Sequence, residues 1–79
     1  MNQDNISLNR MREGSIGRVT ALSATGNMRR RLQDIGLIEG THVECLQKSP
    51  SGDPIAFYIR GAVIALRTAD SKNILVECY

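Results

Sequence analysis

Apolar and polar residues alternate along most of this chain, which is the pattern of half-buried β-strands. Alternating or β-branched apolar residues mark five short segments, which are separated by glycine, proline and other turn-forming residues. The segments are residues 15–22, 42–46, 55–60, 62–66 and 74–79. Short strands at this spacing predict a small β-sandwich or barrel, and a barrel also leaves few strand edges exposed.

One segment, residues 27–35, has the period of a helix. Its apolar residues recur at i, i+4 and i+7 and therefore share one stripe: Met28, Leu32 and Ile35. The next residue is Gly36, which is predicted to take the left-handed position after the helix. The resulting Schellman motif would bring Leu37 onto Leu32.

The predicted fold is therefore mainly β. We expect a small SH3-like β-barrel of about five strands, with one short α-helix after the first strand. Residues 1–7 are expected to form a flexible N-terminal tail, and residues 8–79 to form one domain. Within that domain, Gly17 is expected to mark a bulge or a close backbone approach. A helical turn near residues 68–71 is expected to be capped by Thr68.

Length and charge limit the functional classes. The chain has 79 residues, so it forms a thin core with little room for a substrate pocket, and its net charge is only +2. The longest apolar run covers residues 62–66, whereas a membrane span needs about 20 apolar residues. Residues 1–5 are polar and do not have the pattern of a signal peptide. We therefore expect a cytoplasmic protein that does not insert into a membrane.

The residues that could bind a metal ion are few. They are His42, Cys45 and Cys78. His42 and Cys45 lie three apart on a predicted strand and should point to opposite faces, so they would not bind one ion together. We expect Cys45 to fill the core, His42 to lie on the surface, and both cysteines to be free thiols.

No catalytic motif is recognisable either. The chain contains neither of the glycine-rich phosphate-binding patterns, and its single histidine has no serine in a nucleophile-elbow context. The sequence therefore predicts no enzyme activity, no catalytic residues, no cofactor and no metal ligands.

The main basic cluster is Arg29, Arg30 and Arg31 on the predicted helix. Three consecutive helical residues spread over about 200° of the helix surface, so they do not form one stripe for nucleic acid. Arg30 and Arg31 are both placed to pair with Asp34. We expect no nucleic-acid binding, and interpret the cluster as a solvated face or as a patch for an acidic protein partner.

The loop at residues 49–54 has two interpretations. Two prolines and a glycine in six residues restrict its conformations. It could therefore present a preformed surface to a partner. It could equally be a rigid connection that sets the register of the strands on either side.

The motifs of this chain, taken in order, resemble those of the ferrous iron transport protein A (FeoA) family. The resemblance covers residues 8–77, and its loop motif at residues 50–54 lies near the centre. The motifs are Glu13-Gly14-x-x-Gly17-x-Val19, Arg30-Arg31-Leu32-x-x-Ile35-Gly36-Leu37-x-x-Gly40, Pro50-x-Gly52-Asp53-Pro54-Ile55, Arg60-Gly61-x-x-Ile64-Ala65-Leu66-Arg67 and Ile74-x-Val76.

The resemblance implies a small cytosolic adaptor or regulator of ferrous iron uptake with an SH3-like fold. Its implied partner is FeoB, a membrane transporter that carries a cytosolic G-protein domain. The hypothetical contact residues are Leu37, Pro50, Gly52, Asp53 and Pro54, supported electrostatically by Arg29, Arg30 and Arg31. The alternative is a metal-sensing SH3-like domain of the iron-dependent repressor type. Weak self-association through exposed strand edges stays open.

Overall fold

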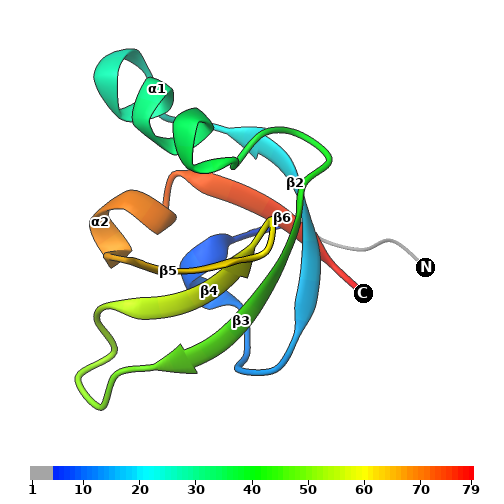
Figure 1. The fold of residues 1–79 in the computed structure, drawn as a ribbon, viewed down its shortest axis with the longest axis vertical. Helices are drawn as coiled ribbons and strands as arrows, with labels where there is room; N and C mark the ends of the chain where they lie inside the picture. Colours follow the sequence, from blue (N-terminus) through cyan, green and yellow to red (C-terminus); the bar gives the residue numbers. More distant parts are fainter. Residues whose placement is uncertain (1–4) are drawn as a thin grey trace.

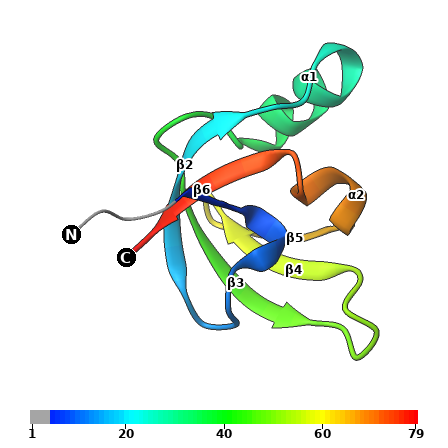
Figure 2. The same ribbon diagram turned by 180° about the vertical axis from the view of Figure 1, so that it is seen from behind.

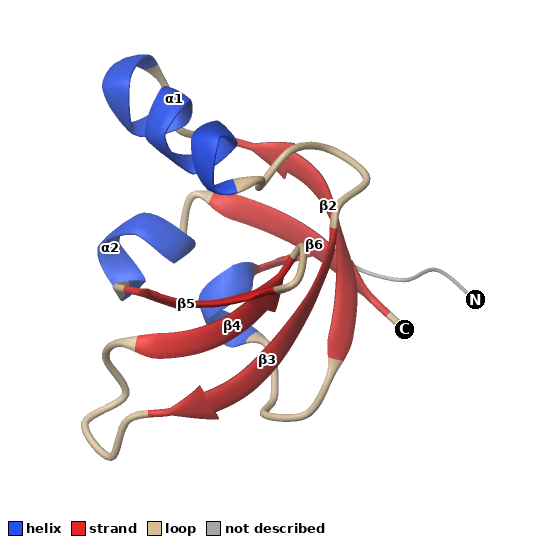
Figure 3. Cartoon of the chain, in the orientation of Figure 1, coloured by secondary structure: helices blue, strands red, loops and turns tan. Residues whose placement is uncertain are grey.

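The computed structural model describes residues 5–79, which contain six strands and three short helices (Figures 1 and 3). The strands are β1 (Asn5–Ser7), β2 (Ile16–Leu22), β3 (His42–Lys48), β4 (Ile55–Ile59), β5 (Ala62–Leu66) and β6 (Ile74–Cys78). The α-helices are α1 (Gly26–Ile35) and α2 (Thr68–Ser71), and the 3-10 helix is η1 (Leu8–Arg10).

All strand pairs are antiparallel, and the sheet order is β1-β6-β2-β3-β4-β5. The prediction of a mainly β fold is confirmed, but the predicted barrel of about five strands differs in strand number and in closure. The described residues form one open six-stranded sheet, in which β1 and β5 are the edges. The helix α1 follows β2, α2 is the helical turn predicted near residues 68–71, and η1 is an additional short helix.

The sixth strand comes from the segment that was predicted to be a flexible tail. Residues 5–7 pair with β6, and Ile6 lies opposite Val76 and packs against the core. Backbone pairing with β6 and the half-buried Ile6 side chain therefore dock this segment. The prediction is wrong for residues 5–7, and its remaining part, residues 1–4, lies outside the described residues.

The end of α1 confirms the predicted Schellman motif. Gly36 has a φ of 111°, which lies in the left-handed region that favours glycine. Its N–H donates to the Gln33 carbonyl, and the Leu37 N–H donates to the Leu32 carbonyl, each at 3.0 Å. Leu32 and Leu37 are both fully buried in the core cluster.

The core contains the inward-facing residues of the sheet and one side of α1. On β4 and β3 these are Ile55, Phe57, Ile59, Val43 and Cys45, as the alternation predicted. Gly17 on β2 confirms the predicted close approach, because a Cβ there would lie 3.2 Å from the Glu77 carbonyl oxygen of β6. The bulge of β2 is instead between Val19 and Ala21.

The helices α1 and α2 and the loop at residues 49–54 lie along one side of the molecule (Figures 1 and 2). The C-terminus lies on the opposite side, where β1, β6 and β2 meet. None of the helices in residues 5–79 is long and apolar enough to cross a membrane.

Candidate partner-binding surface

The proline loop, residues 49–54, is held by its own hydrogen bonds. The Pro54 carbonyl accepts from the backbone N–H of Ser49 at 3.2 Å and from its hydroxyl at 2.7 Å. The Ser49 carbonyl in turn accepts from the Gly52 N–H at 2.7 Å. Pro50, Gly52, Asp53 and Pro54 are all exposed. The predicted contact residues of the loop therefore lie together on the surface, in a shape that the loop itself fixes.

Asp53 also ties this loop to α2. Its Oδ1 accepts a hydrogen bond of 2.9 Å from the Thr68 N–H, which is one of the unpaired donors at the start of that helix. The predicted capping role of Thr68 is thus wrong, since the N-cap position belongs to Arg67 and the capping carboxylate comes from the loop. Thr68 supplies the N–H that is capped.

The arginine cluster reaches the same short helix from the other side. Arg31 forms an ion pair of 2.7 Å with Asp70 of α2, in place of the predicted pair with Asp34. Arg29 donates to the Leu22 carbonyl at 3.2 Å and so lies along the end of β2. Arg30 is exposed on α1. The short helix α2 therefore connects the proline loop to the arginine cluster.

Leu37 is the one predicted contact residue that is buried in the interior of the structure. Its side chain has no exposed area, because the Schellman motif folds it back onto Leu32. The neighbouring Ile38 is 42% exposed. Leu37 is therefore a core residue, and its prediction as a partner contact is wrong.

Five exposed basic residues lie on or directly beside α1 and α2, and we call them the basic surface. They are Arg29, Arg30, Arg31, Arg67 and Lys72. Their acidic neighbours are fewer: Asp70 is paired with Arg31, Asp53 accepts the hydrogen bond at the start of α2, and Asp34 is exposed on α1. The positive charge on this side is thus only partly compensated, which favours encounter with an acidic protein surface.

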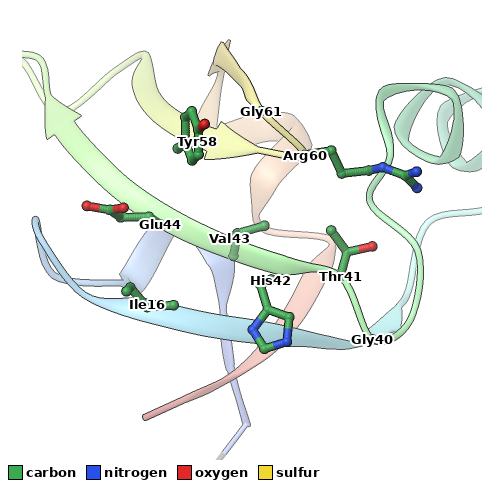
Figure 4. Close-up of a pocket in the computed structure, with 9 residues that line it drawn as sticks. All are labelled: Ile16, Gly40, Thr41, His42, Val43, Glu44, Tyr58, Arg60 and Gly61. Atoms are coloured by element: carbon green, nitrogen blue, oxygen red, sulfur yellow. The ribbon is translucent and has the colours of Figure 1, made fainter.

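A groove that sequence reasoning missed lies on the outer side of the sheet (Figure 4). It has a volume of about 480 Å³ and runs between Ile16 and Tyr58, with His42 and Arg60 towards one end. Ile16 and Tyr58 are each 45% exposed. The signal was present in the alternation, because both residues are apolar at positions where an outward-facing strand residue is expected to be polar.

The Arg60 side chain runs from this groove towards the end of α1 (Figure 4). A Cβ at Gly36 would lie only 2.5 Å from the Arg60 Cδ. The turn between β4 and β5 therefore packs directly onto Gly36 at the end of α1. We call Gly36 and Leu37 the α1 joint. Arg60 itself has a φ of 51°, and Gly61 a φ of 86°, which are the two positive values of a type I′ turn.

His42 and Cys45, two of the side chains that could bind a metal ion, do not point towards one another, as their spacing predicted. The His42 ring is exposed and its Nδ1 lies 3.1 Å from the Tyr79 hydroxyl, whereas Cys45 on the same strand is fully buried. Burial raises the pKa of both thiols, Cys45 and Cys78, so neither is activated as a thiolate at neutral pH. Both cysteines are free. Within residues 5–79, no three His, Cys, Asp or Glu side chains gather into a group that could hold a metal ion.

A comparison with family models decides the identity of the domain. The FeoA domain matches residues 6–78, which is nearly the whole chain. The chain belongs to the FeoA family. The family resemblance that the motifs suggested is thereby confirmed. Comparison with curated proteins gives no significant match.

Solved structures of FeoA proteins have the same fold. A FeoA-like protein from Clostridium acetobutylicum is 36% identical, with a TM-score of 0.87 over 98% of this chain and 88% of that chain. FeoA from Chlorobium tepidum is 32% identical, with a TM-score of 0.83 over 91% of this chain and 69% of that chain. FeoA from Stenotrophomonas maltophilia, described as an SH3 domain protein and solved with zinc, is 24% identical; its TM-score is 0.81 over 91% of this chain and 89% of that chain.

Proposed function

We propose that this FeoA protein is a non-enzymatic adaptor that regulates ferrous iron uptake by binding the cytosolic region of a FeoB-type transporter. The observation that carries the proposal is family membership over residues 6–78. A neighbour from Clostridium thermocellum that is described as iron(II) transport protein A is 32% identical over 91% of this chain, which spans 44% of that chain.

The shape of the proline loop supports an adaptor. A partner that binds a flexible loop must first order it, and this ordering reduces the affinity. Here the hydrogen bonds from Ser49 and Gly52, and the link from Asp53 to α2, hold the loop before any partner arrives. The preformed-surface interpretation is therefore the one that we carry forward.

The basic surface supports an acidic partner. Arg67 and Lys72 are exposed at the two ends of α2, which anchors the proline loop, and Arg30 is exposed on α1. Complementary charge raises association rates and selects partners more than it adds affinity. We therefore expect an acidic patch on the transporter's cytosolic region, and binding that weakens as salt increases.

Fewer observations support the metal-sensing alternative. Zinc was found with the FeoA of S. maltophilia, and manganese-dependent repressors share the fold at 22% and 24% identity, which is evidence for the fold alone. In this chain His42 and Cys45 point to opposite faces of β3. Titration of Fe²⁺ or Co²⁺ should therefore give no saturable set of NMR shifts centred on His42, and such a set would favour this alternative.

Calorimetry with the purified cytosolic region of the transporter tests the adaptor proposal, in both nucleotide states. We expect saturable binding of the wild-type protein. The double substitution Asp53→Ala with Pro54→Ala should weaken it, because it removes the link to α2 and the restriction that the proline ring places on the loop. Arg30→Glu should also weaken it, whereas Arg18→Glu, which makes the same change in net charge on β2 beside Glu77 near the C-terminus, should not. Absence of binding in both states contradicts the proposal.

A further inference from the structure

The edge strand β5 has backbone groups that face outwards and have no partner. The two-residue turn Arg60-Gly61 makes Ile59 and Ala62 the hydrogen-bonded pair that closes the hairpin. Hydrogen-bonded and non-hydrogen-bonded pairs then alternate along an antiparallel ladder. Val63, opposite Tyr58, and Ala65, opposite Ala56, are therefore non-hydrogen-bonded pairs.

It follows that the N–H and C=O groups of Val63 and Ala65 point away from β4. Within residues 5–79, no backbone hydrogen bond joins either residue to another element. Val63 is 66% exposed, and Ala65 is exposed as well. We call these two residues the β5 edge. It offers two donors and two acceptors in the spacing of a strand.

The usual protections of an edge strand are missing from β5. Natural edges are blocked by charged side chains, by proline or by a bulge. The residues Ala62-Val63-Ile64-Ala65-Leu66 contain no charge and no proline, and their pairing with β4 has no irregularity. The other edge, β1, has three residues within the described part of the chain, residues 5–79. Of the two edges, β5 is thus the one suited to accept a further strand.

A small pocket lies beside the β5 edge on the outer side of the sheet. Its volume is about 290 Å³, and it is lined by Gln47, Ser49, Pro50, Pro54, Ala56 and Ala65. The side chains of Ala56 and Ala65 are small, which leaves the space open, and the two prolines form its wall. One register step along, Tyr58 and Val63 form a second exposed apolar contact. A strand added to β5 would meet both with alternate side chains.

Charge identifies the kind of strand that would bind. Arg60 and Arg67 are exposed and lie just beyond the two ends of β5. If two copies paired in antiparallel fashion about Ile64, Arg67 of each copy would lie opposite Gly61 and next to Arg60 of the other. The positive charges would repel each other at both ends. An added strand with acidic ends would instead be attracted.

From this geometry we propose that the β5 edge binds an extended peptide segment of the partner by strand addition. The segment has two alternate apolar residues, one for the proline-walled pocket and one for Tyr58 and Val63, and acidic residues at both ends. The inference rests on the proposed function only for the identity of the protein that supplies the segment.

The test uses a synthetic peptide, so its outcome is independent of the transporter. The probe is an end-blocked peptide, Asp-Glu-Val-Thr-Val-Thr-Asp-Glu, added to the full ¹⁵N-labelled chain at low salt. We expect saturable shifts centred on β5 and the proline loop, and slower hydrogen exchange at the Val63 and Ala65 amides. The same peptide with lysine in place of each acidic residue should bind at least about tenfold more weakly.

Substitutions on the protein then test the backbone contact. Val63→Pro removes an N–H that β4 does not use, so the hairpin should fold, and peptide binding should fall about tenfold for one lost hydrogen bond. Val63→Thr keeps the N–H and should bind normally. If Val63→Pro does not fold, exchange protection at Ala65 decides the question.

Three results would overturn the proposal. The first is a lack of shifts at β5 with the acidic peptide. The second is equal binding by the Val63→Pro and Val63→Thr proteins. The third is a dependence of the Val63 and Ala65 shifts on protein concentration alone, which would make a second copy the occupant. If the peptide binds at β5 but the transporter's cytosolic region does not bind at all, the proposed function fails and the edge site stands.

Discussion

Two regions of this molecule have similar residue types in sequence but differ in the burial of their apolar side chains. The α1 joint and the proline loop each combine a glycine with an apolar residue, and both were predicted to contact a partner. In the joint, Leu37 is fully buried and Arg60 packs over Gly36. In the loop, Pro50 and Pro54 are exposed and hydrogen bonds to Ser49 hold the shape.

The two regions differ in where their apolar side chains lie: in the core for the α1 joint, and at the surface for the proline loop. The Schellman motif turns the chain back over the helix and so delivers Leu37 to the core. The proline loop satisfies its backbone groups locally and through α2, and its prolines remain at the surface. Changes in the joint should therefore be seen in stability, and changes in the loop in binding.

The largest effect is expected at Leu37. Leu37→Ala deletes a fully buried side chain and should lower the free energy of unfolding by about 2–5 kcal/mol. Pro50→Ala is the matched change in the loop, and should alter it by no more than about 0.5 kcal/mol. Urea denaturation followed by circular dichroism measures both. Equal costs would remove the distinction between the two regions.

The next effect is expected at the contact between Gly36 and Arg60. Gly36→Ala should cost about 1–3 kcal/mol, since its φ of 111° strains any side chain and its Cβ would lie 2.5 Å from the Arg60 Cδ. In an Arg60→Ala background only the backbone strain should remain. A double-mutant cycle should therefore give a cost for the pair that is smaller than the sum of the single costs. Simple additivity would show that the turn does not restrict the joint.

A smaller effect is expected at Asp53. Asp53→Ala removes the acceptor of the Thr68 N–H and should cost about 0.5–2 kcal/mol, as the loss of a helix cap does. Asp53→Asn keeps an acceptor oxygen and should recover most of the stability. Thermal unfolding of the two variants makes the comparison. If Asp53→Asn is as unstable as Asp53→Ala, the hydrogen bond is not what anchors the loop.

The smallest effect is expected at the ion pair between Arg31 and Asp70. The Arg31 side chain is 58% exposed, so solvent screens the pair and its coupling should be only about 0.2–1 kcal/mol. A double-mutant cycle with Arg31→Gln and Asp70→Asn measures it, and high salt should reduce it. A coupling well above this range would mean that α1 and α2 act as one rigid unit.

The elements of the fold could be predicted because their signals are local. Alternating or β-branched apolar residues between turn signals predicted the five longer strands, and the spacing of apolar residues with Gly36 predicted α1 and its end. The strand β1 escaped prediction, because only Ile6 marks it and its pairing with β6 is distant in sequence. Closure of the sheet into a barrel likewise depends on the curvature of all its strands, which cannot be predicted from any single segment of the sequence.

The site was predicted where it is local and missed where it depends on distant contacts. The loop at residues 50–54 lies on the surface as expected. The bond between Asp53 and Thr68 and the pair between Arg31 and Asp70 join segments that only the fold brings together. Leu37 is a different case, since the predicted Schellman motif already implied its burial and should have excluded it as a contact.

The central claim is that a partner binds the side of the molecule formed by α1, α2 and the proline loop. The most direct measurement is an NMR titration of the ¹⁵N-labelled chain with the transporter's cytosolic region. The account predicts shifts or broadening at residues 49–54, at α1 and α2, and at Val63 and Ala65. Changes confined to the opposite side, at β1 and the end of β6 near Tyr79, would contradict it.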